Sequence, residues 1–520
     1  MGALALSVAL VGVVSEATAQ SCDCEPYTFL LSASAGGGMP NGPSRNADIS
    51  HDDRYGRVVA FESDASNILG GDTNNATDVF TVQRATPYGI NGTRWRAGAR
   101  RMISRAPGNK PANGASYKPA VSGNAEIGPE CVAFVSKASN LTPGDTNRKA
   151  DAFLYDISSR TLKRVSVSSE GRQANGNTFD VSVDGRCERI AFTSDASNLD
   201  LNSTSRSQWK SGVTKAPRAG TKQVFHRFVA EPKYSDRGLK GLTFLASATN
   251  GTPGNGDSYE TTIASRRGDA VGFTSKATNL SSSDRSAISD IYWRQMPLVR
   301  GSGGLYPRLT TNLISRSRDG RSGGNGPSSD PVASGNHYDS GSGSFIAYQT
   351  LSTNVGTAFS DTNKASDIVR TSIKGGKTSS RYLSNGQQCT RIGNLASRQP
   401  TISEAGTTVM YDTDATNFTC YRPEGNDRNG PIADIFVWTE KRLGSIIFGF
   451  DTNKKALTFD QRNPSTSARI NYYMWETRDP FTDIAMARRS GYYNDPAAIR
   501  EQAREEGRFN QVYMRYGGPE

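Results

Sequence analysis

Histidine is nearly absent from this sequence, with three among 520 residues. Metal sites that need several imidazoles are therefore not expected. No nucleophile elbow of the α/β-hydrolase type is expected, although residues 320–324 match the pattern Gly-x-Ser-x-Gly. The three histidines lie in unrelated contexts, and each is expected to be a loop residue rather than a catalytic base: His51, His226 and His337. The motifs predict no catalytic residue and no cofactor-binding residue.

Long apolar runs are also missing, apart from one stretch near the start, residues 3–14. That stretch is too short to cross a membrane as a helix. Ala17-Thr18-Ala19 follows it and matches a signal-peptidase site. We predict a signal peptide over residues 1–19, although no Lys or Arg precedes the apolar stretch and the start can lie upstream. The protein is then expected to be secreted, extracellular or periplasmic.

Hydrophobic residues make up 35% of the sequence and charged residues 21%, a lean composition typical of loop-rich all-β proteins. The net charge of +11 is a mild excess without long basic runs. It suits either a solvated surface or a basic face for an acidic polymer such as an acidic glycan. Neither a nucleic-acid partner nor a membrane span is expected.

Six cysteines in an apparently exported chain suggest disulfide bonds. We predict the pairs Cys131–Cys187 and Cys389–Cys420. Cys22 and Cys24, in a short lead over residues 20–26, are too close for an easy mutual bond and are expected to pair elsewhere or between chains.

A short apolar segment that ends in an aromatic residue recurs along the chain. Its aromatic residues are Phe61, Phe134, Phe192, Phe273, Tyr348, Tyr411 and Trp475. The mean spacing of about 69 residues gives seven copies, which fill nearly the whole chain after the signal peptide. In each copy, a further segment of the type Asp-Val-Phe follows; these begin at Asp78, Asp151, Gln223, Asp290, Asp367, Asp434 and Gln511.

Each copy contains four short strand-like segments separated by turn residues, the pattern of antiparallel strands. Four such strands repeated radially form a β-propeller blade. We therefore predict an all-β, seven-bladed β-propeller of four-stranded antiparallel blades over residues 27–516. Six blades is the alternative if the degenerate last copy is not a blade. The N-terminal strand is expected to close the last blade and so remove a free sheet edge. Residues 517–520 form a tail.

The run Ser63-Asp64-Ala65-Ser66-Asn67, then Gly71-Asp72-Thr73-Asn74, returns after residue 135 with the same spacing. These motifs resemble the TolB-like, WD-like β-propeller repeats of exported bacterial proteins. The resemblance covers residues 27–516 and is specific for the architecture. It implies binding, scaffolding or surface display, and some such propellers are appended to hydrolases; one fold nonetheless hosts many functions.

The loops before the third strands carry an Asp-x-Asn-x-x-x-Asp pattern. Its full copies are Asp72/Asn74/Asp78, Asp145/Asn147/Asp151 and Asp361/Asn363/Asp367. Clustered carboxylate and amide oxygens are ligands for Ca²⁺. Each copy offers only three side chains, however, so the alternative interpretation is a loop capped by Asx turns.

Asn-x-Ser/Thr sequons are candidate glycosylation sites if the host secretes through a eukaryotic-type pathway. They lie at Asn75, Asn91, Asn140, Asn202, Asn250, Asn279 and Asn417. Three of them share one repeat position, so part of the count follows from the repeat itself.

Two segments interrupt the repeat, residues 200–222 and 478–510, and they suit either partner contacts or tolerated surface loops.

With an export signal, a complete ring and no catalytic set, we expect a secreted, non-catalytic propeller. It would bind protein partners or self-assemble, as a scaffolding module or a structural subunit of an extracellular assembly. The alternative is a hydrolase or lyase that cleaves a polysaccharide in the central channel with dispersed Asp, Arg and Tyr.

Overall fold

The fold is taken from a computed structural model of the 520-residue chain. The structure describes residues 27–52, 56–85, 96–124, 127–200, 213, 215–231, 238–266, 268–296, 311–335, 344–356, 361–374, 377–384, 393–417, 434–439, 444–447, 461–466, 472–477 and 511–516. The predicted signal peptide, the lead with Cys22 and Cys24, the tail, residues 478–510 and most of residues 200–222 lie outside these ranges.

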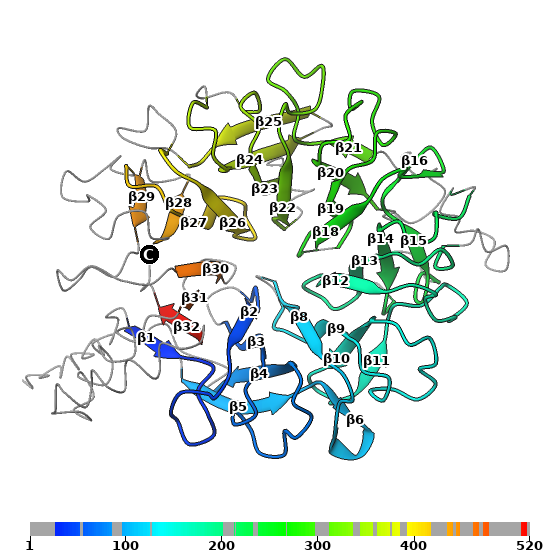
Figure 1. Ribbon diagram of the computed structural model, residues 1–520, viewed down its shortest axis with the longest axis vertical. Helices are drawn as coiled ribbons and strands as arrows, with labels where there is room; N and C mark the ends of the chain where they lie inside the picture. The colour runs from blue at the N-terminus through cyan, green and yellow to red at the C-terminus, as the bar shows by residue number, and fades with distance from the viewer. Residues whose placement is uncertain are drawn as a thin grey trace, which may run out of the picture.

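Four-stranded antiparallel sheets are arranged in a ring, as in a β-propeller (Figure 1). We call the six sheets built from consecutive strands blades 1 to 6. Blade 1 contains β2 (Ser44–Ile49), β3 (Val58–Ser63), β4 (Asp78–Arg84) and β5 (Ala97–Met102). Blade 2 contains β8 (Ser116–Val121), β9 (Cys131–Ser136), β10 (Asp151–Asp156) and β11 (Leu162–Arg164). Blade 3 contains β12 (Thr178–Val183), β13 (Arg189–Ser194), β14 (Gln223–Phe228) and β15 (Thr243–Leu245).

The second half of the ring repeats the same unit. Blade 4 contains β18 (Ser258–Ile263), β19 (Ala270–Ser275), β20 (Asp290–Gln295) and β21 (Thr311–Leu313). Blade 5 contains β22 (Ser328–Ala333), β23 (Ser344–Thr350), β24 (Asp367–Lys374) and β25 (Lys377–Tyr382). Blade 6 contains β26 (Ser397–Ile402), β27 (Thr408–Thr413), β28 (Asp434–Thr439) and β29 (Gly444–Ile447).

A further four-stranded sheet joins the two ends of the chain. It contains β30 (Gln461–Thr466), β31 (Tyr472–Thr477), β32 (Gln511–Tyr516) and the N-terminal β1 (Tyr27–Leu30). β1 pairs antiparallel with β32, with Tyr27 opposite Tyr516. The predicted architecture is thus confirmed: the six blades of consecutive strands match the alternative count, and the closing sheet that uses the N-terminal strand is the seventh.

The repeated aromatic residues are the core of each blade. In five of blades 1 to 6, the aromatic residue of the second strand lies opposite an aromatic residue of the third, as in Phe61↔Phe80 and Phe134↔Phe153. In blade 5, Tyr348 lies opposite Val369. The ring centroids of the first two pairs are 5.7 and 5.9 Å apart, and both pairs are stacked. Directly opposite aromatic side chains stabilise a sheet, each pair by about 0.5–1.5 kcal/mol beyond area burial, which favours an aromatic residue at both positions.

Few elements lie outside the blades. Two short hairpins occur, β6 (Arg105–Ala106) with β7 (Lys110–Pro111), and β16 (Ala248–Thr249) with β17 (Thr252–Pro253). The helical content of the described residues is one 3-10 turn, Pro107–Asn109. No helix long and apolar enough to cross a membrane is found in the described part of the chain.

One of the two predicted disulfides is present. Cys131, at the start of β9, is bonded to Cys187 in the turn between β12 and β13, so the bond links blades 2 and 3. Cys389 and Cys420, predicted as the other pair, lie outside the described residues.

Candidate functional site in the central channel

The innermost strand of each blade has the same irregularity. In five of the six blades the pairing with the second strand skips two residues, for example between Ser329 and Val332 of β22. The residue at the third position of these five strands has a positive φ, between 49° and 54°. In β12 the irregularity is shorter, between Thr178 and Asp180. The third-position residues of blades 1 to 6 are Asn46, Lys118, Asp180, Glu260, Asp330 and Gln399.

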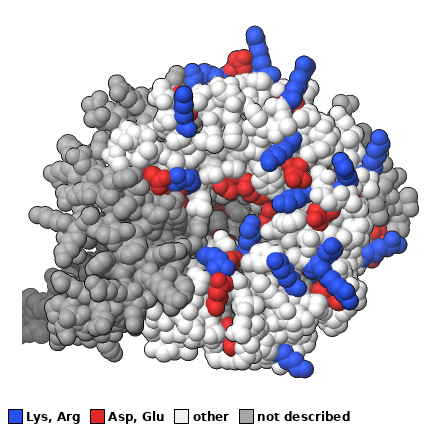
Figure 2. Space-filling view, viewed as in Figure 1, with Lys and Arg blue, Asp and Glu red and all other residues white. Residues whose placement is uncertain are grey.

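These third-position residues put charge into the centre of the ring. Figure 2 shows acidic side chains gathered around the central hollow, with basic side chains beside them. Burial raises the pKa of both Asp180 and Asp330, and Lys118 opposes the shift at both, although the three residues come from blades 2, 3 and 5. Side chains on non-adjacent blades influence one another in this way because they face a common space. Blades 3 to 5 therefore form an acidic wall, with Lys118 on the wall of blade 2.

The carboxylates also connect neighbouring blades. Glu260 Oε2 accepts the backbone N–H of Asp330 at 2.9 Å, and Asp180 Oδ2 accepts the backbone N–H of Glu260 at 3.2 Å. In blade 1, Glu62 Oε2 accepts the backbone N–H of Lys118 at 2.7 Å. The positive φ frees each N–H from the regular ladder, and a carboxylate of the preceding blade satisfies it.

The three channel carboxyls differ in how they are held. Asp180 accepts hydrogen bonds at both oxygens, including one from the Thr193 hydroxyl at 2.8 Å. Glu260 accepts at Oε2 only, from Thr274 and from the backbone of Asp330, so within the described residues Oε1 carries no hydrogen bond. The Asp330 carboxyl has no hydrogen-bond partner in the described ranges.

Burial and the nearby Glu260 raise the pKa of Asp330 well above its ordinary value, against the opposing effect of Lys118. The site therefore places a carboxyl that holds its proton toward neutral pH beside a second carboxyl that is oriented by hydrogen bonds. Neighbouring carboxyls can serve as proton donor and proton acceptor.

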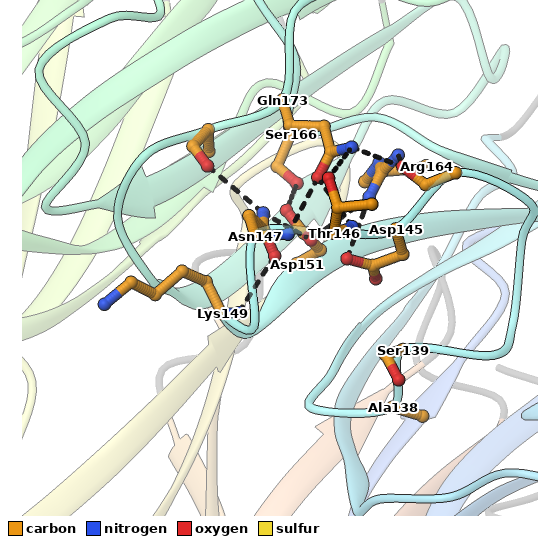
Figure 3. Close-up of polar contacts among 12 residues, drawn as sticks. Ala138, Ser139, Asp145, Thr146, Asn147, Lys149, Asp151, Arg164, Ser166 and Gln173 are labelled. Carbon is orange, nitrogen blue, oxygen red and sulfur yellow. Dashed lines mark hydrogen bonds and ion pairs between the residues drawn. The ribbon is translucent and has the colours of Figure 1, made fainter.

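The Asp/Asn loops lie outside the channel, at the start of each third strand. In blade 2, Asn147 Nδ2 donates to Asp151 at 2.9 Å and its Oδ1 accepts the backbone N–H of Lys149 at 2.9 Å (Figure 3). Ser166 donates to the other Asp151 oxygen at 2.5 Å, and Arg164 lies 3.2 Å from Asp145. The amide and carboxylate groups of this copy are thus engaged with one another and with the strand start.

The copy in blade 1 makes the same asparagine and serine hydrogen bonds to its aspartate. Asn74 Nδ2 donates to Asp78 at 2.8 Å, and Ser104 donates to the other oxygen of Asp78 at 2.5 Å. Asp72 belongs to the same loop, and its pKa is raised by burial. Met102 holds the register position of Arg164, and Arg105 is the arginine that opposes the raised pKa of Asp72 and Asp78 here.

In blade 5, Asn363 Oδ1 accepts the backbone N–H of Ala365 at 2.7 Å, and Asp361 Oδ1 accepts the N–H of Asn363 at 2.9 Å. Ser384 donates to Asp367 at 2.7 Å. All three copies thus make Asx turns. In the described ranges, no group of three or more His, Cys, Asp or Glu is arranged to hold a metal ion. Calcium binding at these nine residues stays a prediction.

A second repeated contact explains the Ala-Ser/Thr-Asn sequences. In blade 2, Asn113 Nδ2 donates to Ser139 Oγ at 2.9 Å, and Asn113 Oδ1 accepts the backbone N–H of Ser139 at 2.8 Å. Asn140 Oδ1 accepts the backbone N–H of Asn113, and its Nδ2 donates to the Pro111 carbonyl at 3.0 Å. The same clasp is centred on Asn41, Asn175, Asn255, Asn325 and Asn394 in the other blades.

This clasp separates the sequons into two groups. The amide groups of Asn140 and Asn279 are hydrogen-bonded within it, and Asn417 Oδ1 accepts the N–H of Asn394. Asn75 and Asn250 are exposed loop residues with positive φ. Asn91 and Asn202 lie outside the described residues. Glycosylation at all of these residues stays a prediction.

Two of the three histidines are described. His226 is fully buried on β14 and contacts the Gly268 carbonyl through Nε2 at 3.0 Å. Burial and the nearby Arg189 lower its pKa to about 3, so it is neutral and structural. His51 lies in the turn after β2, and His337 is outside the described residues.

Comparison with known proteins gives the fold only. No family model matches the sequence, and no curated protein matches it. Among solved structures, the chain is similar to Pyrococcus horikoshii acylaminoacyl peptidase in an orthorhombic crystal form, with 9% identity and a TM-score of 0.38 over 84% of this chain and 49% of that one. It is also similar to a structure from a study of two prolyl endopeptidases, with 10% identity and a TM-score of 0.36 over 85% of this chain and 54% of that one.

An acylaminoacyl peptidase in complex with Z-Gly-Gly-Phe-chloromethyl ketone gives 11% identity and a TM-score of 0.31, over 84% of this chain and 57% of that one. This chain thus spans about half of the length of these structures. The prediction of a non-catalytic binding or structural module is corrected by this finding, because the similar structures are those of peptidases rather than of scaffold proteins. At this level of identity the likeness concerns the fold, so peptidase activity is not transferred to the chain.

The channel residues Lys118, Glu260 and Asp330 were not singled out from the sequence. The signal that could have found them is their shared position, two residues after the Ser or Thr that starts each innermost strand. A column of Asn, Lys, Asp, Glu, Asp and Gln in otherwise small-residue strands is a departure from the pattern of a buried strand.

Proposed function

We propose that this protein is a channel enzyme, a hydrolase or lyase that cleaves a polysaccharide by carboxyl acid–base catalysis. Asp330 and Glu260 are the residues that carry the reaction. The observation behind this proposal is the convergence on the channel of Lys118, Glu260 and Asp330, one from each of three blades, with Asp330 beside Glu260.

The two carboxyls suit opposite proton-transfer roles. Asp330 holds its proton toward neutral pH and can donate it to the leaving oxygen of a glycosidic bond. Glu260 is fixed through Oε2, which leaves Oε1 to accept a proton, from water in hydrolysis or from a ring carbon in elimination. In both cases one proton is given and one is taken, so the pair returns to its starting state after proton exchange with solvent.

The remainder of the ring suits a hydroxyl-rich polymer. Asn46 and Gln399 supply amide groups at the same level of the channel, and Lys118 supplies a positive charge without an ion pair to a described carboxylate. Hydrogen-bonding side chains at equal height around a channel can hold successive hydroxyl groups of a sugar chain.

We further propose that the protein is an exported member of the TolB-like propellers. The N-terminal apolar stretch, the signal-peptidase site and the Cys131–Cys187 bond support export, because disulfides persist in oxidising compartments. Mass spectrometry of the protein recovered from its host tests this by locating the mature N-terminus, which is expected after Ala19.

Turnover on a panel of neutral and acidic polysaccharides tests the enzymatic proposal. Asp330→Asn and Glu260→Gln are each expected to lower kcat at least 100-fold, since general acid–base groups contribute about 10²–10⁴-fold. Asp319→Asn is the matched control, because Asp319 is an exposed carboxylate in an outer turn. The alkaline limb of the pH profile is expected to follow deprotonation of Asp330, with activity lost as pH rises.

Polysaccharide turnover that is unchanged in Asp330→Asn would refute the assignment of the acid. Peptide substrates form a second arm of the panel, because the similar solved structures are peptidases. If only peptides are turned over, and if this turnover depends on the same two carboxyls, the substrate is a peptide rather than a polysaccharide.

A further inference from the structure

A cavity of about 660 Å³ lies between the outer strands of blades 1 and 2, away from the channel. Figure 1 shows β5 and β6 on the outer rim of the ring beside β10 and β11, whose residues line it. Pockets that bury most of a small organic ligand have volumes of roughly 300–1,000 Å³. The cavity is therefore of a size to hold a small ligand rather than a single ion.

The lining carries four arginines and no acidic residue: Arg100, Arg101, Arg105 and Arg160. Arg100 donates to the Ala33 carbonyl at 2.9 Å, and Arg105 donates to the Asn109 carbonyl at 2.9 Å and to the Gly70 carbonyl at 3.2 Å. Main-chain carbonyls thus orient these two guanidinium groups, and Arg105 also acts on Asp72 and Asp78, whose raised pKa values it opposes. None of the four forms an ion pair with a described carboxylate.

Arg101 from β5 and Arg160 from the turn between β10 and β11 line the cavity together with Tyr155 of β10. Burial raises the pKa of the Tyr155 hydroxyl, and both arginines act against this shift. Apolar side chains complete the lining: Leu69, Leu141, Pro143 and Leu162. The cavity therefore combines positive charge contributed by both blades with apolar side chains and the largely buried Tyr155.

The repeat does not require these arginines. In five blades a serine hydroxyl donates to the side chain that starts the third strand, and these serines align the fourth strands: Ser104, Ser166, Ser247, Ser315 and Ser384. At the position of Arg100, the other four blades have Leu162, Thr243, Thr311 and Ser380. Arg100 is thus specific to blade 1, and Arg160 comes from a turn outside any strand. Arg101 has basic counterparts in Lys163 and Arg381, so the feature specific to this cavity is the combination of Arg101 with Arg100 and Arg160.

We propose that this cavity binds an acidic oligosaccharide, whose carboxylate or sulfate groups are held by Arg101 and Arg160 and whose sugar ring packs on the apolar lining. Planar guanidinium groups form paired hydrogen bonds with carboxylate and sulfate oxygens. The apolar wall suits the carbon face of a sugar ring, which a free inorganic anion lacks. The cavity is separate from the channel, so a negative binding result for the cavity would not contradict the enzymatic proposal.

Isothermal titration calorimetry on the full chain tests the proposal with three ligands: a uronic-acid tetrasaccharide, a neutral tetrasaccharide and inorganic sulfate. The acidic tetrasaccharide is expected to bind at least 10-fold more tightly than either of the others. The double variant Arg101→Gln/Arg160→Gln is expected to weaken this binding at least 10-fold. Neither side chain makes a hydrogen bond to a described residue, so the variant is expected to fold.

Arg381→Gln is the matched control, because Arg381 is the exposed arginine of blade 5 at the repeat position of Arg101. It is expected to leave affinity unchanged. Equal loss of binding in Arg381→Gln, or no loss in the double variant, overturns the site. Absence of binding to the acidic tetrasaccharide overturns the proposal, and binding of inorganic sulfate with equal affinity overturns the sugar ligand.

Discussion

Blade 2 has a neighbour on each side, and its two outer interfaces are built differently. Toward blade 3, Arg227 lies within 3.1 Å of the carbonyl oxygens of Val167 and Ser168, and Thr243 donates to the same Val167 carbonyl at 2.7 Å. The Cys131–Cys187 bond adds a covalent link. Toward blade 1, the corresponding space is the arginine-lined cavity.

The two interfaces differ in the partners of their arginine side chains. Arg227 uses its guanidinium to join two blades, and Arg164 is paired with Asp145. Arg101 and Arg160 have neither kind of partner among the described residues. One interface of blade 2 is thus built for cohesion, whereas the other leaves charge available to a ligand. The following predictions would break or sharpen this contrast.

Removing the disulfide is expected to have the largest effect. The bond closes a loop with a sequence separation of 56 residues, and such a cross-link stabilises by about 4 kcal/mol. The Cys131→Ala/Cys187→Ala double variant should therefore lose about that much free energy of unfolding in urea denaturation. A loss below about 1 kcal/mol would show that the interface of blades 2 and 3 does not depend on the cross-link.

Arg227→Met should cost about 2 kcal/mol in the same measurement. The change removes hydrogen bonds that join blade 2 to blade 3 and leaves the buried Val167 carbonyl with fewer donors. Oligosaccharide binding should be unchanged. If affinity fell along with stability, the two interfaces would not be independent.

The pH dependence of stability should differ between Asp78 and Asp151. Burial raises the pKa of Asp78 from its ordinary 3.8 to about 6 against the opposing effect of Arg105, and burial also raises that of Asp151, where Arg164 opposes the shift and lies 3.6 Å from the carboxylate. A carboxyl whose folded pKa is raised stabilises the fold below its unfolded pKa and loses that contribution as pH rises through the folded pKa.

Asp78→Asn should therefore reduce the decline in unfolding free energy between pH 4.5 and pH 7 by about 1 kcal/mol, and Asp151→Asn by less. Urea denaturation at a series of pH values measures both variants. A larger effect at Asp151 would contradict the neutralising role of Arg164.

Arg101→Met should change the free energy of unfolding least, by under about 0.5 kcal/mol, because exposed or half-exposed arginines without fixed partners contribute little. Its effect should instead appear in ligand affinity. A loss of more than about 1 kcal/mol would make Arg101 a structural residue and weaken the contrast with Arg227.

Much of the fold could be predicted from the sequence. The aromatic residue that ends each second strand, such as Phe61 or Phe134, predicted both the repeat and the blade, because its partner on the third strand repeats with it. The Cys131–Cys187 pair was also predicted. The function was predicted wrongly as a non-catalytic module, since the search for motifs followed residues adjacent in sequence.

The candidate site escaped prediction for the same reason. Lys118, Glu260 and Asp330 are 70 or more residues apart and form no motif. Each looks like a solvated residue of a short strand, and only the bulge with its positive φ directs all of them to one channel. The Asp72 and Asp145 loops looked more like a site, yet their polar groups hydrogen-bond to one another and to the strand starts.

The sequence by itself determined the blade, because alternating strands, aromatic pairs and Asx turns are local patterns that recur with each copy. It also determined the closure by the N-terminal strand, since an incomplete last copy needs one more strand. The tertiary structure alone decided which side chains meet in the channel and which arginines stay without a carboxylate. Those relations depend on the radial arrangement of blades, which brings distant segments within electrostatic reach.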